Sequence, residues 1–263
     1  MKPSPAPQHY RDPAALDVLV SGASRGIGLA LVEQLLERGS TRRVYAGART
    51  ATSAPRLTEL ARAWPDRLRL LDMDLCDEAS LAAALERVGA EVDALDITIN
   101  CVGLLHEGET VWPEKRLADV SVAALERSFA VNAIGPLLLA RQLQPLLPRN
   151  ERAVLANLSA RVGSIGDNRL GGWYSYRASK AAQNMITRTL SIELARRARG
   201  IVCVALHPGS VDTGLSAPFQ AGVPAGRLFT PERAARQLLE VIDGLRAEDN
   251  GGFFAWDGSR IPW

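Results

Sequence analysis

The residues in this sequence best suited to chemistry are a tyrosine and a lysine four positions apart, Tyr176 and Lys180. On a helix this spacing puts both side chains on one face. A free tyrosine has a pKa of about 10, so roughly one phenol in a thousand is ionised at neutral pH. A nearby ammonium stabilises the phenolate and eases proton transfer. The pair is therefore suited to general acid catalysis at a carbonyl oxygen, with the tyrosine acting as a base in the reverse direction.

A glycine-rich turn lies about 150 residues earlier, directly after an apolar run: Gly22-Ala23-Ser24-Arg25-Gly26-Ile27-Gly28. Glycine lets backbone approach a phosphate closely, and a helix N-terminus offers unpaired N–H groups and a favourable dipole to an anion. The spacing differs from the commoner Gly-x-Gly-x-x-Gly, but its place between a strand and a helix indicates a dinucleotide site. Either motif alone is weak. Together, in this order, they predict a nicotinamide-dependent reductase.

Short apolar runs alternate with longer amphipathic runs along the chain, which is typical of a parallel sheet covered by helices on both faces. We expect an α/β fold, a Rossmann-type doubly wound sheet of about seven strands, in one domain over residues 16–263 after a flexible tail at 1–15. Strands are predicted at 16–21, 43–47, 67–71, 95–100, 153–158, 201–206 and 252–256. Helices are predicted at 27–38, 78–88, 121–147, 174–197 and 231–245, with Pro136 near a bend or in an early turn.

The composition excludes several other classes of protein. Hydrophobic residues make up 47% and charged residues 23% of the 263 residues, and the net charge is +2. Basic and acidic residues are interspersed, so we expect no nucleic-acid surface. The three cysteines have no metal-ligand spacing. We expect no membrane-spanning stretch and no secretory signal, which predicts a cytoplasmic protein.

Two long connections follow predicted strands, at 104–120 and 212–230. Ligands of open α/β sheets bind beyond the carboxyl ends of strands, so these segments are candidate walls or lids. Trp112, Trp173 and Phe219 could line an apolar pocket there, although core packing or an oligomer contact explains each equally well.

The end of the second predicted strand bears on the choice between NAD and NADP. An NAD site usually has an acidic residue there, whereas this chain has Ala46-Gly47-Ala48-Arg49-Thr50. Arg25 in the glycine turn supplies a second guanidinium. Two arginines suit a 2′-phosphate through charge-assisted hydrogen bonds, which favours NADP.

Several further motifs, in the same order along the chain, make the sequence resemble the short-chain dehydrogenase/reductase superfamily, and within it the C-factor-like, sniffer-type carbonyl reductases. The resemblance covers nearly the whole chain. Besides the two motifs above, it is carried by Asp72-Met73-Asp74-Leu75, Asn100-Cys101-Val102-Gly103, Pro113-Glu114-Lys115-Arg116-Leu117, Val131-Asn132-Ala133-Ile134-Gly135-Pro136, His207-Pro208-Gly209-Ser210-Val211-Asp212-Thr213 and Ile261-Pro262-Trp263.

The resemblance implies roles for individual residues. Lys180 is expected to hold the nicotinamide ribose and to tune Tyr176, and Asn132 to hold a water that links Lys180 to solvent. His207 is expected to be structural. The resemblance also implies a homodimer or homotetramer packed through the helices at 121–147 and 174–197. The other residues expected to contact the cofactor are Asp74 and Leu75 at the adenine, Asn100, Val102 and Gly103 near the adenosine ribose, and Pro208, Gly209, Val211 and Thr213 at the carboxamide.

One position departs from the family pattern. The family usually has two adjacent serines after the fifth strand, and the second polarises the substrate carbonyl. Here the pair is Ser159-Ala160, so alanine occupies the expected catalytic position. Three outcomes are open: a bulge turns Ser159 inward, Ser164 supplies the hydroxyl, or Tyr176 acts alone and activity is low.

The leading hypothesis is an NADPH-dependent oxidoreductase that reduces an aldehyde or ketone reversibly, with the proton donated by Tyr176. The alternative is a nucleotide-binding signalling or scaffold protein of the C-factor type with weak or no turnover. A nucleotide-sugar epimerase shares the Tyr-x-x-x-Lys pair but fits the glycine spacing and the short C-terminal portion poorly.

Overall fold

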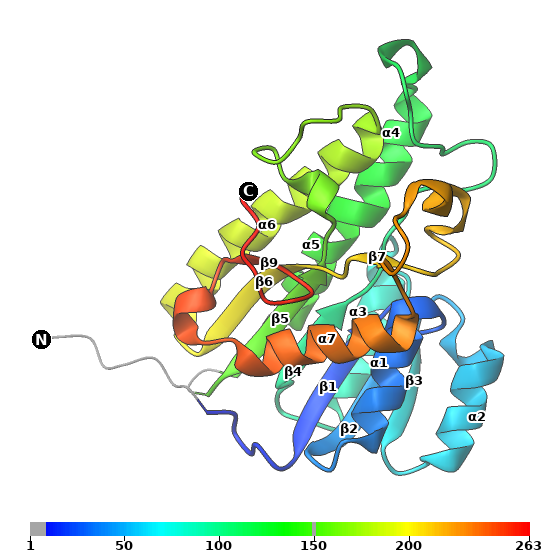
Figure 1. Ribbon diagram of the computed structural model, residues 1–263. Coiled ribbons are helices and arrows are strands. Elements are labelled where there is room, and N and C mark those ends of the chain that lie inside the picture. Colours follow the sequence, from blue (N-terminus) through cyan, green and yellow to red (C-terminus); the bar gives the residue numbers. More distant parts are fainter. Residues whose placement is uncertain (1–8, 149–150) are drawn as a thin grey trace, which may run out of the picture.

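The computed structural model describes residues 9–148 and 151–263, and shows a seven-stranded parallel sheet with helices on both faces (Figure 1). The strand order is β3-β2-β1-β4-β5-β6-β9, so the order reverses between β1 and β4. These strands are β1 (Leu16–Ser21), β2 (Thr41–Ala48), β3 (Leu68–Asp72), β4 (Ile97–Asn100), β5 (Ala153–Leu158), β6 (Ile201–His207) and β9 (Phe253–Ala255). The predicted α/β fold with its seven-stranded sheet is confirmed.

Two hydrophobic cores lie on opposite faces of this sheet. On one face α1 (Gly26–Glu37), α2 (Pro55–Ala63) and α7 (Pro231–Gly244) cover the strands, and Figure 1 shows α1 and α7 side by side. On the other face lie α3 (Glu78–Gly89), α5 (Gly135–Leu143) and α6 (Tyr174–Arg197). The central strands β1, β4 and β5 are buried throughout, as expected for strands covered on both sides.

Three elements were missed by the sequence patterns. Helix α2 buries only Leu57 and Leu60, so its apolar stripe is too short to stand out. Strands β7 (Ser210–Val211) and β8 (Leu228–Phe229) form a separate two-stranded ribbon between β6 and α7. Two-residue strands carry no readable alternation, which explains why both were missed.

The expected long helix at 121–147 is divided into α4 (Val122–Phe129), a π-helical turn at Ala130–Ile134, and α5. Pro136 is the second residue of α5, where the missing N–H costs nothing, as expected. By length and composition alone the stretch Val122–Leu146 could cross a membrane, because an 18-residue window within it has a mean hydropathy of 1.3. The expectation that no stretch is long and apolar enough is therefore wrong. Packing of this stretch against α3 and α6 accounts for its buried apolar side chains, whereas Val122, Ile134 and Leu137 are exposed.

The segment before β1 contacts the folded body. Arg11 forms an ion pair with Asp17 at 3.1 Å, and the guanidinium of Arg152 stacks on Tyr10. The first eight residues of the expected tail at 1–15 lie outside the described residues.

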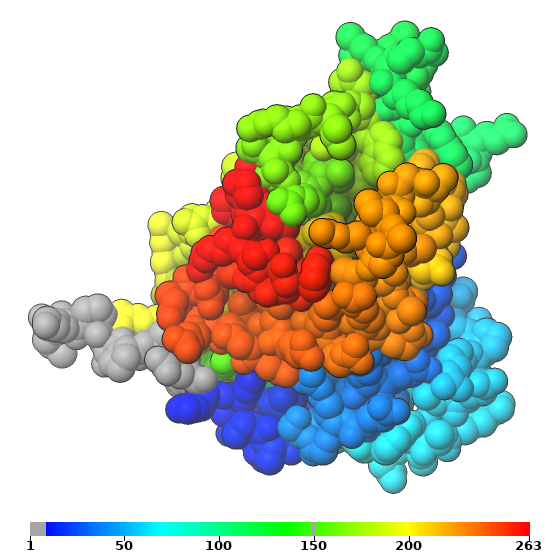
Figure 2. All heavy atoms as spheres, viewed as in Figure 1, coloured from blue at the N-terminus to red at the C-terminus, as the bar shows by residue number. Residues whose placement is uncertain are grey.

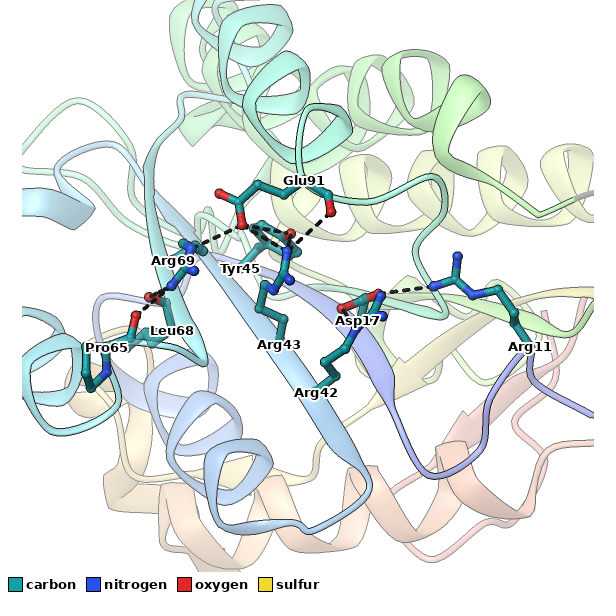
Figure 3. A network of polar contacts seen from close by, with 9 residues as sticks. All are labelled: Arg11, Asp17, Arg42, Arg43, Tyr45, Pro65, Leu68, Arg69 and Glu91. Carbon is teal, nitrogen blue, oxygen red and sulfur yellow. Dashed lines mark hydrogen bonds and ion pairs between the residues drawn. The ribbon is translucent and has the colours of Figure 1, made fainter.

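Polar contacts bind the strands together at the amino edge of the sheet (Figure 3). The Asp17 side chain on β1 is fully buried and accepts hydrogen bonds from Arg11 and from Arg42 on β2. Beside it, Glu91 accepts from Arg43 at 3.0 Å and from Arg69 on β3 at 3.1 Å. Asp17 and Glu91 are thus each held by two guanidinium groups, whereas the buried Asp96 beside them accepts from the backbone N–H of Asp17 at 2.8 Å.

Candidate active site

The glycine turn follows the carboxyl end of β1. Its first and last glycines, Gly22 and Gly28, leave no space for a Cβ atom. Gly22 has φ +76°, and a Cβ there would lie 3.0 Å from the backbone nitrogen of Val102. A Cβ on Gly28 would lie 2.2 Å from the carbonyl oxygen of Gly22. Gly26, at φ +56°, lies directly against Thr213, because a Cβ there would be 3.1 Å from the Thr213 methyl group. The turn therefore runs close against both neighbouring segments.

The N-terminus of α1 fits a dinucleotide phosphate. Among the described residues, the cap residue Arg25 is exposed and makes no side-chain hydrogen bond to the first turn of the helix. Ser24 and Ile27 flank it and are half-buried. The first-turn N–H groups therefore carry the positive end of the helix dipole toward the cleft, where an anion can accept from them.

The strand ends beside the turn carry the residues expected at the adenosine. Arg49 is exposed directly after β2, whose Gly47 pairs with Ser21 of β1. Asp74 is half-buried and accepts from the backbone N–H of Cys76 at 2.9 Å. Leu75 is buried, and Gly135 lies so close that a Cβ there would be 3.0 Å from the Leu75 Cβ. Arg25 and Arg49 thus lie on neighbouring segments at one corner of the sheet.

The Asn100 side chain points into the protein rather than into the cleft. Its Oδ1 accepts from Ser21 Oγ at 2.8 Å and from the N–H of Val102 at 3.1 Å, and its Nδ2 donates to Asn157 at 3.0 Å. Asn157 donates in turn to Thr187 on α6 at 3.1 Å. These bonds fix the carboxyl ends of β1, β4 and β5 relative to α6, so Asn100 can reach a ribose only through its backbone.

Tyr176 and Lys180 share the buried face of α6, as their spacing predicts, with both side chains directed at the carboxyl edge of the sheet. The Lys180 Nζ donates to the carbonyl oxygen of Leu158 and to Gln183 Oε1, both at 2.9 Å. Burial lowers the pKa of Lys180 to about 7 and raises the pKa of Tyr176, so the stabilisation of the phenolate expected from the Lys180 ammonium is not seen. The phenol therefore stays protonated at neutral pH, while the amine is close to half protonated.

Asn132 lies in the π-helical turn, a feature that often occurs at functional sites. Its amide exchanges hydrogen bonds with the backbone of Leu104, at 2.7 and 2.8 Å, and donates to Ser179 Oγ at 3.0 Å. A Cβ on Gly103 would lie 3.6 Å from Lys180 Nζ and 3.7 Å from Asn132 Oδ1. The two polar side chains therefore flank the same glycine without contacting each other directly.

Both serine candidates are hydrogen-bonded away from Tyr176. Ser159 Oγ donates to Asn184 Oδ1 at 2.7 Å, and its backbone N–H continues the regular ladder to Leu206 at 2.8 Å, so no bulge turns it. Ser164 Oγ donates to the carbonyl oxygen of Pro262 at 2.5 Å. Figure 2 shows the C-terminal residues (red) beside α7 and beside the segment that follows β5. Of the three outcomes, this arrangement favours an oxyanion contact from Tyr176 alone.

The segment after β6 forms the opposite wall of the cleft. Pro208 and Gly209 follow the strand directly, and Gly209, at φ +81°, packs so closely that a Cβ would lie 2.7 Å from the Phe229 ring. Val211 is buried in β7, and Thr213 faces the glycine turn. Burial lowers the pKa of His207 to about 4, and its Nδ1 lies 3.3 Å from the N–H of Arg161. His207 is therefore a neutral packing residue, consistent with the structural role expected for it.

Four aromatic rings from three segments meet above Tyr176. The Trp173 ring lies 6.2 Å from the Tyr176 ring and 5.3 Å from that of Phe219. Phe219 lies 5.2 Å from Trp112, and His106 contacts both while its Nε2 lies 3.0 Å from the carbonyl oxygen of Gly214. The two long connections thus join into one apolar wall beside the phenol.

Gln183 is a site residue that sequence reasoning missed. It is fully buried, its Oε1 accepts from Lys180, and its Nε2 has no partner among the described residues. Its position three residues after Lys180 puts it on the same face of the predicted helix, but the spacing does not show that its side chain turns toward the amine.

Comparison with known proteins shows the family of the chain. The family model described as short chain dehydrogenase matches residues 17–223, so the chain belongs to the short-chain dehydrogenase/reductase family and is an oxidoreductase. An NADPH-bound carbonyl reductase from chicken fatty liver superposes with a TM-score of 0.84 at 30% identity, covering 99% of this chain and 100% of that one.

Two other relatives agree with the subgroup. The carbonyl reductase Sniffer of D. melanogaster superposes with a TM-score of 0.82 at 27% identity, over 94% of this chain and 99% of that one. The C-signal protein of Myxococcus xanthus is 39% identical over 169 residues, which is 64% of this chain and 93% of that protein. The expected resemblance to sniffer-type carbonyl reductases and to C-factor is thereby confirmed.

Proposed function

We propose that this protein reduces an aldehyde or ketone with NADPH, reversibly, and that Tyr176 donates the proton to the carbonyl oxygen. The observation that carries the proposal is the burial of Tyr176 and Lys180, one helical turn apart, at the sheet edge that also holds the glycine turn. The carbonyl reductases that superpose on the chain support the same reaction class.

The residues present suit each part of that reaction. The first turn of α1 would hold the pyrophosphate, with Gly22, Gly26 and Gly28 allowing the approach. When bound, the nicotinamide supplies the hydride that adds to the carbonyl carbon. The raised pKa of Tyr176 keeps its proton in place until the carbonyl oxygen gains charge, and Lys180, one helical turn further along the same buried face, would resupply that proton.

The preference for NADP over NAD is part of the proposal. It is supported by Arg25 and Arg49, exposed on neighbouring segments at the end of β1 and β2, and by the small residues Gly47 and Ala48 where an acidic residue would favour NAD. Replacing both arginines by alanine is expected to weaken NADPH binding at least tenfold and to leave NADH binding within twofold. Equal losses for the two cofactors would contradict the preference.

The test of the reaction compares two tyrosines in the first turn of α6. Tyr176→Phe is expected to lower kcat by about 10³-fold, the contribution of a positioned acid, with NADPH binding unchanged. Tyr174→Phe is the matched control, because this ring is 40% exposed whereas Tyr176 is buried, and it is expected to retain activity. The assay is NADPH oxidation with a panel of aldehydes and ketones.

The competing proposal is a nucleotide-binding signalling or scaffold protein with weak turnover. Two observations favour it: the likeness to the C-signal protein, and the hydrogen bonds that direct Ser159 and Ser164 away from Tyr176. Tight NADPH binding without turnover of any carbonyl, and without loss in Tyr176→Phe, would select this reading over the reductase.

We also propose that copies of the chain associate through α5 and α6. Ile134, Leu137, Met185 and Ile192 are large apolar side chains that are 42–66% exposed on or beside these two helices. Such a surface fits an interface between copies better than contact with water. A Met185→Glu, Ile192→Glu variant is expected to be monomeric by light scattering, where the parent is a dimer or tetramer; a monomeric parent would refute the proposal.

A further inference from the structure

Backbone strain is concentrated directly before the catalytic helix. Gly171, Gly172 and Trp173 have φ values of +65°, +62° and +54° in succession, and Trp173 is the only non-glycine residue with positive φ in the described ranges. This conformation is unfavourable for a bulky side chain, because its Cβ crowds the following carbonyl. Strain of this kind persists only where the surroundings impose it, and it clusters at functional sites.

Two residues hold this segment, one through its backbone and one through its side chain. The carbonyl oxygen of Glu114 accepts the Trp173 N–H at 2.5 Å. The Arg177 guanidinium, one helical turn on, donates to the carbonyl oxygens of Gly171 at 3.2 Å and Gly172 at 3.0 Å. The left-handed run is therefore fixed by hydrogen bonds to its own backbone.

The Glu114 side chain is anchored as well. It is 4% exposed, and its two oxygens accept from the Ser175 N–H, at 3.1 Å, and from the Ser175 hydroxyl. Ser175 is the second residue of α6, so a carboxyl group from the first long connection caps the catalytic helix. The backbone and the side chain of one residue thus join segments 61 positions apart in the sequence.

The strained residue carries the ring that touches the catalytic phenol. Trp173 contacts the ring of Tyr176 edge-on and also contacts Phe219, which continues the apolar wall to Trp112. An ordinary helical or extended backbone at Trp173 would direct the indole elsewhere. The position of the apolar wall beside Tyr176 therefore depends on the backbone conformation of Trp173.

We propose that Glu114 is a positioning residue that fixes Trp173 beside Tyr176, and that Trp173 determines specificity by favouring carbonyl substrates with a flat apolar group. This inference rests on the proposed reductase function. A flat apolar substituent would stack against the indole and exclude water from the phenol. A short aliphatic aldehyde gains little from the same ring.

The test compares kcat/KM for a bulky aryl ketone with that for a short aliphatic aldehyde. Trp173→Asn keeps a residue that tolerates positive φ and removes the indole. It is expected to lower the ketone-to-aldehyde ratio about tenfold, mainly through KM for the ketone. Glu114→Ala should lower the ratio similarly, and Glu114→Gln, which retains one accepting oxygen, should fall between Glu114→Ala and the parent. Glu109→Gln, exposed in the same connection, is the matched control and should leave the ratio unchanged.

A second readout needs neither cofactor nor substrate. Ultraviolet titration, with Tyr176→Phe as reference, follows ionisation of Tyr176, whose pKa is raised by burial. Trp173→Asn and Glu114→Gln should both lower that pKa toward its ordinary value, because the indole no longer shields the phenol. The double variant should behave like Trp173→Asn alone, since Glu114 acts through that ring.

The outcomes separate the two hypotheses. A parent that fails to reduce any carbonyl but shows the expected titration shifts contradicts the proposed function and leaves the Glu114–Trp173 arrangement standing. A substrate ratio and a Tyr176 titration both unchanged in Trp173→Asn and Glu114→Gln would overturn the inference, whether or not Glu114→Ala folds. Equal losses for both substrates would also overturn it, because they show a purely structural role.

Discussion

Asp17 and Lys180 are buried ionisable groups at opposite edges of the same parallel sheet, and their surroundings differ. At the amino edge the fully buried Asp17 faces two guanidinium groups, from Arg11 and Arg42. At the carboxyl edge the buried Lys180 faces only neutral oxygens, those of Leu158 and Gln183. Since removing an ion from water is costly unless an opposite charge compensates it, the first arrangement serves stability and the second does not.

The carboxyl edge gains reactivity from this lack of compensation. Without a carboxylate partner, burial lowers the pKa of Lys180 to about 7, near the pH at which a proton donor or acceptor works best. Burial also keeps the Tyr176 phenol protonated. Asp17 is therefore distinguished by its two guanidinium partners, and Lys180 by a buried amine without a charged partner.

The largest change in kcat is expected from a variant that adds a hydroxyl group at the carboxyl edge. Ala160→Ser adds a hydroxyl where the family usually has its carbonyl-polarising serine, and is expected to raise kcat by up to about 10²-fold, the typical contribution of one such donor. Single-turnover hydride transfer from NADPH measures the change.

Two serine variants are the controls for that gain. Ser159→Ala and Ser164→Ala are expected to change kcat less than threefold, because their hydroxyls bond Asn184 and Pro262. A collapse of activity in either one, with no effect of Ala160→Ser, would show that a substitute hydroxyl already acts.

The next largest effect, on the free energy of unfolding, is expected from a variant that removes the carboxylate shared by two arginines at the amino edge. Asp17→Asn leaves Arg11 and Arg42 without their shared carboxylate, but both side chains are about a third to two-fifths exposed, at 32% and 44%, so water partly compensates. We expect a loss of about 2 kcal/mol in the free energy of unfolding, below the 3–5 kcal/mol of a fully buried pair. Urea denaturation measures it, and kcat/KM should stay within twofold of the parent.

A surface pair provides the control for Asp17. Asp243→Asn breaks the ion pair with Arg38, whose members are 50% and 30% exposed, and should cost less than about 0.5 kcal/mol. Equal stability losses in the two variants would remove the distinction between a buried and an exposed carboxylate on which the comparison depends.

How far the sequence predicts this molecule depends on how local each signal is. Helix α6 and strand β5 were predicted with their observed bounds because their patterns are long or continuously apolar. The glycine turn was readable because close approach leaves only glycine possible. The partners of Ser164 and Lys180 were not readable, since one lies 98 positions away and the other depends on a side-chain rotamer.

The third effect concerns stability against pH. Lys180 has a folded pKa near 7, below its ordinary 10.5, so between these values the unfolded chain binds more protons than the folded one. The free energy of unfolding should therefore rise with pH across this window, by at most about 1.4 kcal/mol per pH unit, and be lowest below pH 7. Lys180→Met should remove this slope. A parent and variant with parallel pH profiles would show that the lysine is not held in its neutral form.

The smallest effect is a change in the pKa of Lys180 when its partner Gln183 is replaced. Gln183→Leu removes one of the two oxygens that accept from Lys180 Nζ, which should lower the pKa of Lys180 by about one further unit, the worth of a hydrogen bond to a charged group. Gln183→Glu supplies the missing carboxylate and should raise that pKa.

The pH dependence of kcat measures both changes. Because reduction consumes a proton, the limb where kcat falls with rising pH should move to lower pH in Gln183→Leu and to higher pH in Gln183→Glu. A packing defect would lower kcat equally at every pH, so it could not shift the two profiles in opposite directions. Superimposable profiles for the two variants would mean that Gln183 does not set the charge of Lys180, and that the reactive edge is tuned by burial alone.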